Sequence, residues 1–524
     1  MIMEELKNIQ PREYQQKIFE TASKHNTLVV LPTGMGKTLI ALMLSIDRIK
    51  KFPKSKILFL APTRPLASQH HSYFVKHLPE LFAEMTLFTG KVDASKRKEL
   101  WEQANIIFST PQCIANDVKA NRFDLSEVSL LIVDECHRCL KNYDYTYVAQ
   151  KYKEKAQNLR ILGLTASPGS KSEIINEICK NMNIDAVEIR HRYSEDVKQY
   201  IQKLDTELIR VELPEELKKI RELLDEIYNK RVDELKNRGL LYSHATKIAL
   251  LELQGKLQRM IATGSNHFNI LRGVSVCAQA IKISHAIELL ETQNVETTMK
   301  YILDLMEQAK QNKSKAAEQL VKHSNFQKAY IGLVELIKKG IEHPKVAMLK
   351  EVVIEEMQKN KNAKIMIFNH YRDSIAKICR ELNELKKQGK ADIRAKVFVG
   401  QTIKGETGMS QKEQQEILNE FKAGEINILC ATSIGEEGLD IPEVNVVIFY
   451  EPIPSAIRQI QRRGRTARLM PGKLIILMTV KTRDERYYWA AFHKERKMHG
   501  ILDGMQKQFN KKIEEKKQKD LTEF

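Results

Sequence analysis

The stretch "LPTGMGKTLIALML", residues 31–44, decides the fold of this chain. It follows the apolar run "TLVV" at 27–30 and continues as a segment with apolar residues at helical spacing. Between the two, Gly34 and Gly36 permit a tight turn whose backbone N–H groups can point inward at phosphate oxygens. A strand that passes through such a loop into a helix is the unit of an α/β fold, and it predicts a site for a phosphorylated ligand.

Two side chains after the turn supply the remaining chemistry of a nucleotide site. Lys37 can reach the β- and γ-phosphates, and the Thr38 hydroxyl can bind Mg²⁺. The usual first glycine of a phosphate loop is absent, and Leu31 stands in its place. A glycine-rich turn without a ligand is the alternative, which the strand–loop–helix context disfavours. We therefore expect ATP and Mg²⁺ as cofactors, held by the loop residues Pro32, Thr33, Gly34, Met35, Gly36, Lys37 and Thr38.

A pair of carboxylates follows further along the chain, in "LLIVDECHRC" at 130–139. Asp134 and Glu135 end a strand-like run, where two adjacent carboxylates are costly unless a cation meets them. A magnesium-bound nucleotide supplies that cation. Asp134 would hold the metal, and Glu135 would orient and deprotonate the attacking water. The alternative is a solvated strand end whose acids begin a helix.

The order of apolar runs predicts two lobes of the same type. Strand-like runs alternate with helical segments in two separate regions, which is typical of parallel sheets that are buried on both faces. Between the regions lies a helical pattern with few Pro or Gly and no strand-like run. The predicted fold class is therefore α/β, with parallel-sheet lobes at residues 1–203 and 343–485, a helical insert at 204–342 and a basic helical tail at 486–524.

Bulk composition limits the possible partners. The chain has 524 residues, enough for three or four domains, and a formal net charge of +18. Such a charge favours a polyanionic partner, although a basic surface without that role is the alternative. No segment is apolar enough for a signal peptide or a membrane span. The seven cysteines are scattered, and the Cys136/Cys139 pair lacks a second pair at zinc spacing, so we expect no disulfides and a reducing cytoplasmic location.

The phosphate loop, the Asp-Glu-Cys-His sequence and "LTASP" at 164–168 occur in an order that resembles superfamily 2 helicases of the DExH type. The resemblance covers nearly the whole chain and implies two RecA-like lobes that hydrolyse ATP between them. It also implies that Gln15 pairs with the adenine edge, with help from Arg12. Thr165 and Ser167 would link the nucleotide site to a nucleic-acid strand.

The same resemblance assigns contacts to that strand. "APTRPLASQHH" and "FSTPQ" resemble strand-contacting motifs of the first lobe, and "IFNHYRDS" resembles one of the second. The expected strand contacts are Arg64, Thr110, Asn369, Arg372, Gln401 and Thr432.

Two further motifs of the second lobe have roles in this scheme. "ATSIGEEGLDIP", at 431–442, would place Gly438 and Asp440 beside the nucleotide. Ser410 has two possible roles, because it could contact the strand or form a helix capping box with Glu413. The sequence leaves these two roles of Ser410 open.

Five arginines lie in "RQIQRRGRTAR" at 458–468. On a continuous helix, Gln461, Arg465 and Arg468 would share one face. The resemblance implies that this face meets the triphosphate and that both arginines stabilise charge on the γ-phosphate. Arg458 and Arg462 could serve a nucleic-acid backbone or a structural ion pair.

The helical insert resembles that of the Hef branch, which includes the Fanconi-anaemia M type, and also that of the RIG-I-like and Dicer helicases. The motifs "QRRGRTAR", "APTRPLASQH" and "GMSQKEQQEIL" are most similar to the Hef branch. That resemblance implies ATP-dependent translocation on forked or branched DNA at stalled replication forks, association with the nucleoid, and fusion or association with an XPF-type nuclease. The insert would be a wedge for branched DNA, and plain packing between lobes is the alternative. A double-stranded RNA translocase of the RIG-I-like or Dicer type is the second interpretation. The triplet at 495–497, "ERK", is interpreted as ordinary helix surface and not as a nuclease motif.

Overall fold

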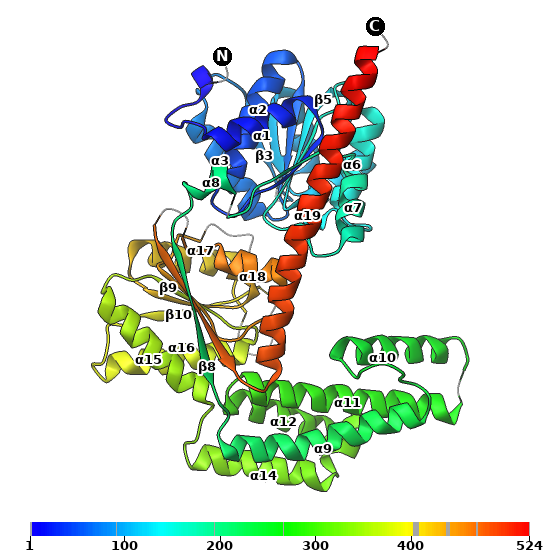
Figure 1. Cartoon of the computed structure of the whole chain (residues 1–524), viewed down its shortest axis with the longest axis vertical. Coiled ribbons are helices and arrows are strands. Elements are labelled where there is room, and N and C mark those ends of the chain that lie inside the picture. Colours follow the sequence, from blue (N-terminus) through cyan, green and yellow to red (C-terminus); the bar gives the residue numbers. More distant parts are fainter. Residues whose placement is uncertain are drawn as a thin grey trace.

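The computed structural model describes residues 3–90, 92–192, 194–265, 267–401, 408–435, 441–467 and 470–522. Figure 1 shows two α/β lobes, a helical arm that projects away from them, and a long C-terminal helix that passes both lobes. The predicted fold class is confirmed.

The first lobe is built on a seven-stranded sheet in the order β3-β4-β2-β5-β6-β1-β7. All neighbouring strands are parallel. Parallel order brings the carboxyl ends of the strands to one edge, where the phosphate loop follows β1 and the carboxylate pair closes β5. The strands are β1 (Thr27–Val30), β2 (Lys56–Leu60), β3 (Met85–Phe88), β4 (Ile106–Ser109), β5 (Val128–Asp134), β6 (Ile161–Thr165) and β7 (Ala186–Ile189).

Two hydrophobic cores lie on opposite faces of this sheet, because alternate residues of each strand contribute to different cores. One core includes residues of α1 (Glu13–Lys24), α2 (Lys37–Lys51), α3 (Arg64–His77) and α8 (Glu195–Lys198). The other includes residues of α4 (Ala94–Gln103), α5 (Pro111–Lys119), α6 (Asp144–Lys155) and α7 (Ser172–Asn181).

The second lobe is a six-stranded parallel sheet in the order β10-β11-β9-β12-β13-β8. The insert was predicted to begin at residue 204, but residues 204–211 form the edge strand β8 of this sheet and pair with β13. The strands are β8 (Leu204–Val211), β9 (Ile365–Phe368), β10 (Ala395–Phe398), β11 (Ile428–Ala431), β12 (Val446–Phe449) and β13 (Gly472–Thr479). The helices of this lobe are α15 (Pro344–Lys359), α16 (Arg372–Lys387), α17 (Gln411–Ala423) and α18 (Ala456–Arg463).

The helical insert is an arm with two hydrophobic cores of its own. The core nearer the lobes is shared by α9, α11, α12, α13 and α14, and the distal core by α9, α10 and α11. The helices are α9 (Glu215–Asn237), α10 (Lys247–Ala262), α11 (Phe268–Thr292), α12 (Val295–Lys310), α13 (Lys315–Val321) and α14 (Ser324–Lys338). Because each half of the arm has a core, the distal half can project without support from the lobes.

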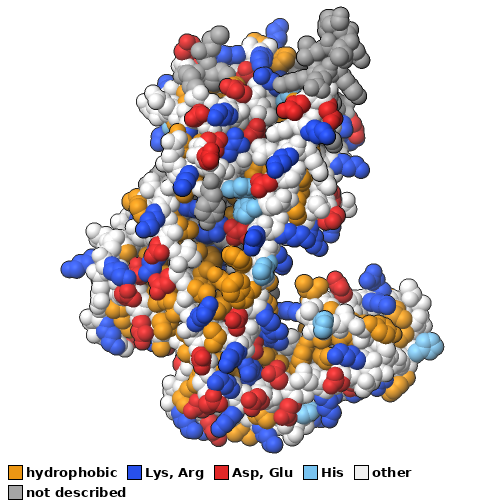
Figure 2. Space-filling view, in the orientation of Figure 1, with side chains coloured by type: hydrophobic (Ala, Val, Ile, Leu, Met, Phe, Trp, Pro, Cys, Tyr) orange, Lys and Arg blue, Asp and Glu red, His pale blue; other side chains and the backbone are white. Residues whose placement is uncertain are grey.

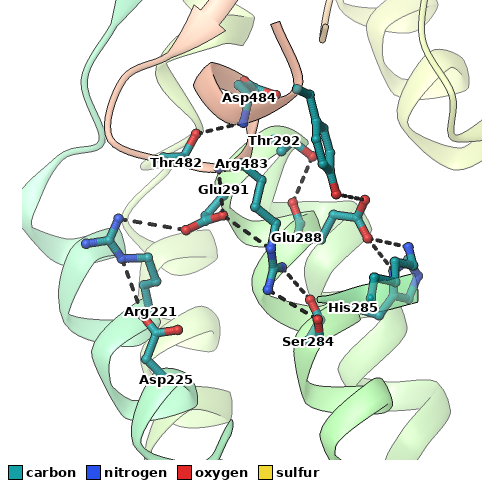
Figure 3. Close-up of polar contacts among 12 residues, drawn as sticks. Arg221, Asp225, Ser284, His285, Glu288, Glu291, Thr292, Thr482, Arg483 and Asp484 are labelled. Atoms are coloured by element: carbon teal, nitrogen blue, oxygen red, sulfur yellow. Dashed lines mark hydrogen bonds and ion pairs between the residues drawn. The ribbon is translucent and has the colours of Figure 1, made fainter. Parts of the chain in front are cut away.

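A polar joint connects the end of α11 to α19 (Arg483–Thr522), the C-terminal helix (Figure 3). The Arg483 backbone N–H donates to Glu291 Oε2 at 3.2 Å, and its guanidinium donates to Ser284 Oγ at 3.2 Å. The hydroxyl of Tyr487 donates to Glu288 Oε1 at 3.1 Å. Since both glutamates are buried, these bonds fix the arm to the base of α19.

A second layer of the joint reaches into the second lobe. Gln293, at the turn after α11, donates from Nε2 to Glu451 Oε2 at 3.3 Å. The His370 backbone N–H donates to the other oxygen, Oε1, at 2.7 Å. Burial raises the pKa of Glu451 to about 7, although the charges of Arg462 and Lys345 oppose that shift. The buried carboxyl of Glu451 therefore links Gln293 of the arm to the charge of Arg462 in α18.

We expect Glu451→Gln to flatten the pH dependence of stability between about pH 4.5 and pH 7. In that window the folded protein retains the Glu451 proton that the unfolded chain has lost, so the free energy of unfolding falls as pH rises. The full change amounts to at most about 3 kcal/mol. Urea unfolding at pH 5 and pH 7.5 measures it. The control Glu416→Gln, at an exposed position, should preserve the wild-type slope, and an unchanged slope in Glu451→Gln would contradict the assignment.

The long helix α19 ties the tail to the first lobe. Its side chains Met498, Leu502 and Met505 are buried in a core of that lobe, together with Ile460 of α18. The predicted basic tail is thus helical, and its first half packs against both lobes.

All seven cysteines are buried, and none forms a disulfide. Within the described ranges, no helix has the length and apolarity needed to cross a membrane.

Candidate functional site

The phosphate loop has the backbone that its glycines predict. Gly34 and Gly36 adopt φ values of 82° and 77°, in the left-handed region that favours glycine. A Cβ on Gly36 would lie 2.3 Å from Gln15 Nε2, so only glycine fits there. α2 begins at Lys37, whose ammonium donates to the Leu31 carbonyl at 2.9 Å. The loop therefore combines a cation with a helix N-terminus, an arrangement that suits phosphate.

Gln15 packs directly under the phosphate loop. Its Nε2 donates to the Met35 carbonyl at 3.1 Å, and its Oε1 accepts from the Arg12 backbone N–H at 2.8 Å. The Arg12 guanidinium lies 4.7 Å from the centre of the Tyr200 ring, a neighbour that the sequence did not indicate. The structure thus joins both predicted adenine contacts to the loop, and Gln15 holds the loop backbone here.

The two predicted metal ligands converge on one histidine. His70 Nε2 lies 2.8 Å from Asp134 Oδ2, and its Nδ1 lies 3.3 Å from Thr38 Oγ1. Burial would raise the pKa of Asp134, but His70 and the charge of Lys37 hold it below its ordinary value. A carboxylate and a hydroxyl that approach from different elements are hard oxygen ligands, which fit Mg²⁺. Sequence analysis missed His70, although its motif contains two adjacent histidines.

Glu135 turns the chain sharply after β5. It adopts a left-handed backbone with φ 48°, a conformation that is costly for a residue with a side chain and is concentrated at functional sites. Its carboxylate lies 3.2 Å from His137 Nδ1, which in turn lies 3.3 Å from Thr165 Oγ1. Thr165 Oγ1 also accepts from the Ser167 backbone N–H at 3.1 Å. The carboxylate pair is thus connected to the "TAS" segment through His137, while the predicted link from this segment to a nucleic-acid strand stays a prediction.

The arginine segment is not one continuous helix. Ser455 caps α18, accepting from the Arg458 backbone N–H at 3.4 Å, and the helix ends at Arg463. The prediction that Gln461 and Arg465 share a helical face is therefore wrong, because Arg465 follows the turn at Gly464. A Cβ on Gly464 would lie 2.8 Å from Thr33 Oγ1, so this turn is in contact with the phosphate loop.

Arg465 is 7% exposed, and its carbonyl accepts from the Val444 backbone N–H at 3.2 Å. Three other predicted nucleotide residues, Arg468, Gly438 and Asp440, lie outside the described residues.

Two neighbouring arginines have structural partners. Arg462 is fully buried, with its guanidinium 5.0 Å from the centre of the Phe368 ring. Arg463 donates to Glu495 Oε1 of α19 at 2.6 Å. Although burial opposes ionisation, His499 and Arg463 lower the pKa of Glu495 to about 2. Glu495 was predicted to be ordinary helix surface, and it instead forms an ion pair between α19 and α18.

A cleft of about 750 Å³ separates the lobes beside this segment. It brings the predicted strand contacts Arg372 and Thr432 together with the predicted catalytic Gln461. The first lobe contributes His137 and Arg138, which follow the carboxylate pair in the sequence. The lining residues are His137, Arg138, His370, Arg372, Gly400, Thr432, Ser433, Ile434, Ser455, Ile457, Arg458 and Gln461.

Asn369 does not face the cleft, so its predicted strand contact is wrong for this structure. It is fully buried. Its Nδ2 donates to Gln293 Oε1 at 2.9 Å and to Ser374 Oγ at 3.1 Å, and its Oδ1 accepts from the Tyr371 backbone N–H at 2.7 Å. One amide hydrogen is therefore bonded to the turn after α11 in the arm, and the other to α16 of the second lobe.

The other predicted strand residues are accessible. Arg64 and Thr110 are partly exposed at the starts of α3 and α5, and Gln401 is exposed. Ser410 forms the capping box of α17: its Oγ accepts from the Glu413 backbone N–H at 3.3 Å. The structural role of Ser410 is thereby confirmed.

Three family models match consecutive parts of the chain. A DEAD/DEAH box helicase model matches residues 12–175, and a helicase conserved C-terminal domain model matches residues 344–470. A model described as "Putative ATP-dependent RNA helicase, helical bundle" matches residues 216–339. These matches fall on the first lobe, the second lobe and the arm.

Known proteins of the same architecture are similar over most of this chain. The crystal structure of the Pyrococcus furiosus Hef helicase domain superposes with a TM-score of 0.70 and 43% identity, covering 92% of this chain and 98% of that one. "Putative ATP-dependent RNA helicase MJ1505" of Methanocaldococcus jannaschii is 41% identical over 97% of this chain and 62% of its own length. "ATP-dependent DNA helicase fml1" of Schizosaccharomyces pombe is 33% identical over 90% of this chain and 57% of its own length. The chain therefore spans about three-fifths of the length of these two relatives.

Proposed function

This chain belongs to the superfamily 2 helicases of the DExH type, and on that premise we propose that it hydrolyses ATP between its lobes to move along forked or branched DNA. The observation that carries the proposal is the contact between Gly464 and Thr33. It brings the arginine turn of one lobe against the phosphate loop of the other, as required for a triphosphate held between lobes.

Different residues of the chain have different roles in ATP hydrolysis. Lys37 and the loop N–H groups bind the β- and γ-phosphates, while Thr38 and Asp134 hold Mg²⁺. Bound Mg²⁺ neutralises charge on the phosphate oxygens. Glu135 orients the attacking water and accepts its proton, and Arg465 and Arg468 stabilise charge on the γ-phosphate. Arg12 and Gln15 position the base, while Gln461, Gly438 and Asp440 complete the site from the second lobe.

Strand contacts are expected along the interlobe cleft. Arg372 and Thr432 line that cleft, and Arg64, Thr110 and Gln401 present further polar groups from both lobes. Contacts of this kind reach phosphates and sugars, so sequence preference should be weak. The formal charge of +18 supports the same polyanionic partner.

The arm supports a branched substrate. Tyr242 and Phe268 lie near its distal end and are 90% and 77% exposed. Rings presented at the end of a projecting arm can stack on a base pair at a junction, so we assign the arm as the wedge. On the resemblance to the Hef branch, we also expect an XPF-type nuclease, fused to this chain or associated with it, as a partner. We expect the DNA substrate in the cytoplasm.

The decisive experiment compares the ATPase rate with forked DNA, linear DNA duplex and duplex RNA at equal nucleotide concentration. Forked DNA should stimulate the rate most. A larger stimulation by duplex RNA would favour the second candidate, a double-stranded RNA translocase, which the printed name of the M. jannaschii relative supports.

The same assay tests the wedge. Tyr242→Ala with Phe268→Ala should reduce the preference for forks over linear duplex by roughly tenfold, because about one stacked base is lost. Leu81→Ala, an exposed substitution on the first lobe, is the control and should keep the wild-type preference. An unchanged fork preference in the double variant would contradict the wedge.

A further inference from the structure

The helix α19 presents large aromatic side chains to solvent. Trp489 and Phe492 are 42% and 46% exposed, and His493 is exposed beside them. The Trp489 ring centre lies 5.8 Å from that of Phe492 and 6.3 Å from that of His493. Spacings of three and four residues place all three rings on one face of the helix.

This face is separate from the one that packs on the protein. Ala491, Met498 and Leu502 are buried and lie on the opposite side of α19. The exposed sides of the rings therefore point away from the surface that packs on the lobes. Exposed apolar side chains that are grouped together often mark a site where another molecule binds.

Cations flank the rings. Arg486, Arg496 and Lys497 are exposed on the same face. Two acids lie between residues 485 and 500. Glu485 accepts from the Lys481 backbone N–H at 2.9 Å, and Glu495 points to the interior, where it pairs with Arg463. Rings interleaved with cations complement a strand with unpaired bases and a phosphate backbone. Duplex DNA fits less well, because its base faces are stacked on one another.

This segment of α19 lies beside the interlobe cleft. Lys494 Nζ donates to the Pro454 carbonyl at 2.8 Å, and Ser455, the next residue, lines that cleft. From this point α19 runs between the arm and the first lobe, and Figure 2 shows Lys and Arg side chains along that edge of the molecule. A strand that leaves the cleft at Ser455 therefore reaches the segment of α19 that carries the rings.

We propose that this face, the α19 stripe (Arg486, Trp489, Phe492, His493, Arg496 and Lys497), binds single-stranded DNA by stacking unpaired bases on its rings and pairing phosphates with its cations. The proposal rests on the proposed function, since it requires a motor that exposes single strands. The stripe would hold one strand outside the cleft after the branch opens.

Tryptophan emission tests the contact directly. The chain has two tryptophans, and Trp101 is buried against Phe123, so emission changes on DNA binding report Trp489. Saturating oligo(dT), added without nucleotide, should quench the wild-type emission and leave that of Trp489→Phe unchanged. Trp489→Phe should bind oligo(dT) like wild type, because phenylalanine also stacks.

Affinity supplies the second measurement. Trp489→Ala with Phe492→Ala should weaken oligo(dT) binding by roughly tenfold to a hundredfold, with a smaller effect on linear duplex. Leu303→Ala, an exposed apolar residue of similar exposure on the arm, is the matched control and should change neither affinity.

Three outcomes are informative. Unquenched Trp489 emission together with wild-type affinity in the double variant would overturn the stripe, while ATPase stimulation by DNA would leave the proposed function standing. A wild-type protein that neither binds DNA nor responds to it would overturn the proposed function itself. Concentration-dependent dimerisation that the double variant abolishes, with DNA affinity unchanged, would show that a second copy covers the rings and would also overturn the proposal.

Discussion

Lys37→Ala should lower the DNA-stimulated ATPase rate by roughly a hundredfold to a thousandfold, the effect typical of removing one preorganised charge from a transition state. The Lys37 ammonium lies inside the phosphate loop, bonded to the Leu31 carbonyl, and its charge also helps to hold Asp134 ionised. Alanine removes the cation that would follow the γ-phosphate as charge develops. Phosphate release at saturating ATP and forked DNA measures the loss.

DNA binding distinguishes this effect from unfolding. The proposed strand contacts lie elsewhere on the lobes, so Lys37→Ala should bind forked DNA within about twofold of wild type, as measured by fluorescence anisotropy. Lys51→Ala, on the exposed face of the same helix, is the matched control because it removes an equal charge far from the loop. Hydrolysis by Lys37→Ala within a few-fold of wild type would refute the assignment of the loop.

The fold could be predicted where strands are buried on both faces. β1, β5 and β12 are wholly buried, so their sequences are unbroken apolar runs. β8 was missed because it is an edge strand: all residues of "LDTELIRV" but the last are exposed or half-buried, and the run resembles the start of the helical segment that follows. Its place became visible only through its pairing with β13.

The site could be predicted where the chemistry is local. Backbone turns at Gly34 and Gly36 and the ends of buried strands are properties of short segments, so the loop and Asp134 were recognisable. Asn369 and His70 depend on distant residues. Asn369 donates to Gln293, which lies in a different part of the fold. The sequence alone does not show whether an asparagine side chain has all its hydrogen bonds made inside the protein or is exposed to a ligand.

The prediction of one continuous helix for the arginine segment was wrong for a related reason. "RRGRTAR" continues the helical spacing of "AIRQIQ", and an isolated glycine does not by itself end a helix. The helix ends because Gly464 must approach the phosphate loop of the other lobe, where any Cβ would meet Thr33. The glycine that broke the predicted pattern is therefore the feature that brings the two halves of the site together.

Arg465→Ala should lower the ATPase rate by about a thousandfold, the lower range for loss of an arginine that stabilises phosphoryl transfer. Arg465 directly follows the glycine that touches the phosphate loop, and it is nearly excluded from solvent. Because a planar guanidinium can pair with two phosphate oxygens at once, Arg465→Lys should remain at least about tenfold below wild type.

Nucleotide binding separates this arginine from the phosphate loop. In the proposed assignment, Arg465 would act on charge that develops during hydrolysis, whereas Lys37 would also contact the ground-state phosphates. Arg465→Ala should therefore bind a fluorescent ATP analogue within a few-fold of wild type, and Lys37→Ala should not. Arg463→Ala is the neighbouring control, because it breaks the ion pair with Glu495. It should lower the melting temperature and leave the ATPase rate of the folded protein within a few-fold of wild type. If Arg465→Ala hydrolysed ATP at nearly the wild-type rate, the turn at Gly464 would be a packing contact between lobes, and the γ-phosphate would need another source of positive charge.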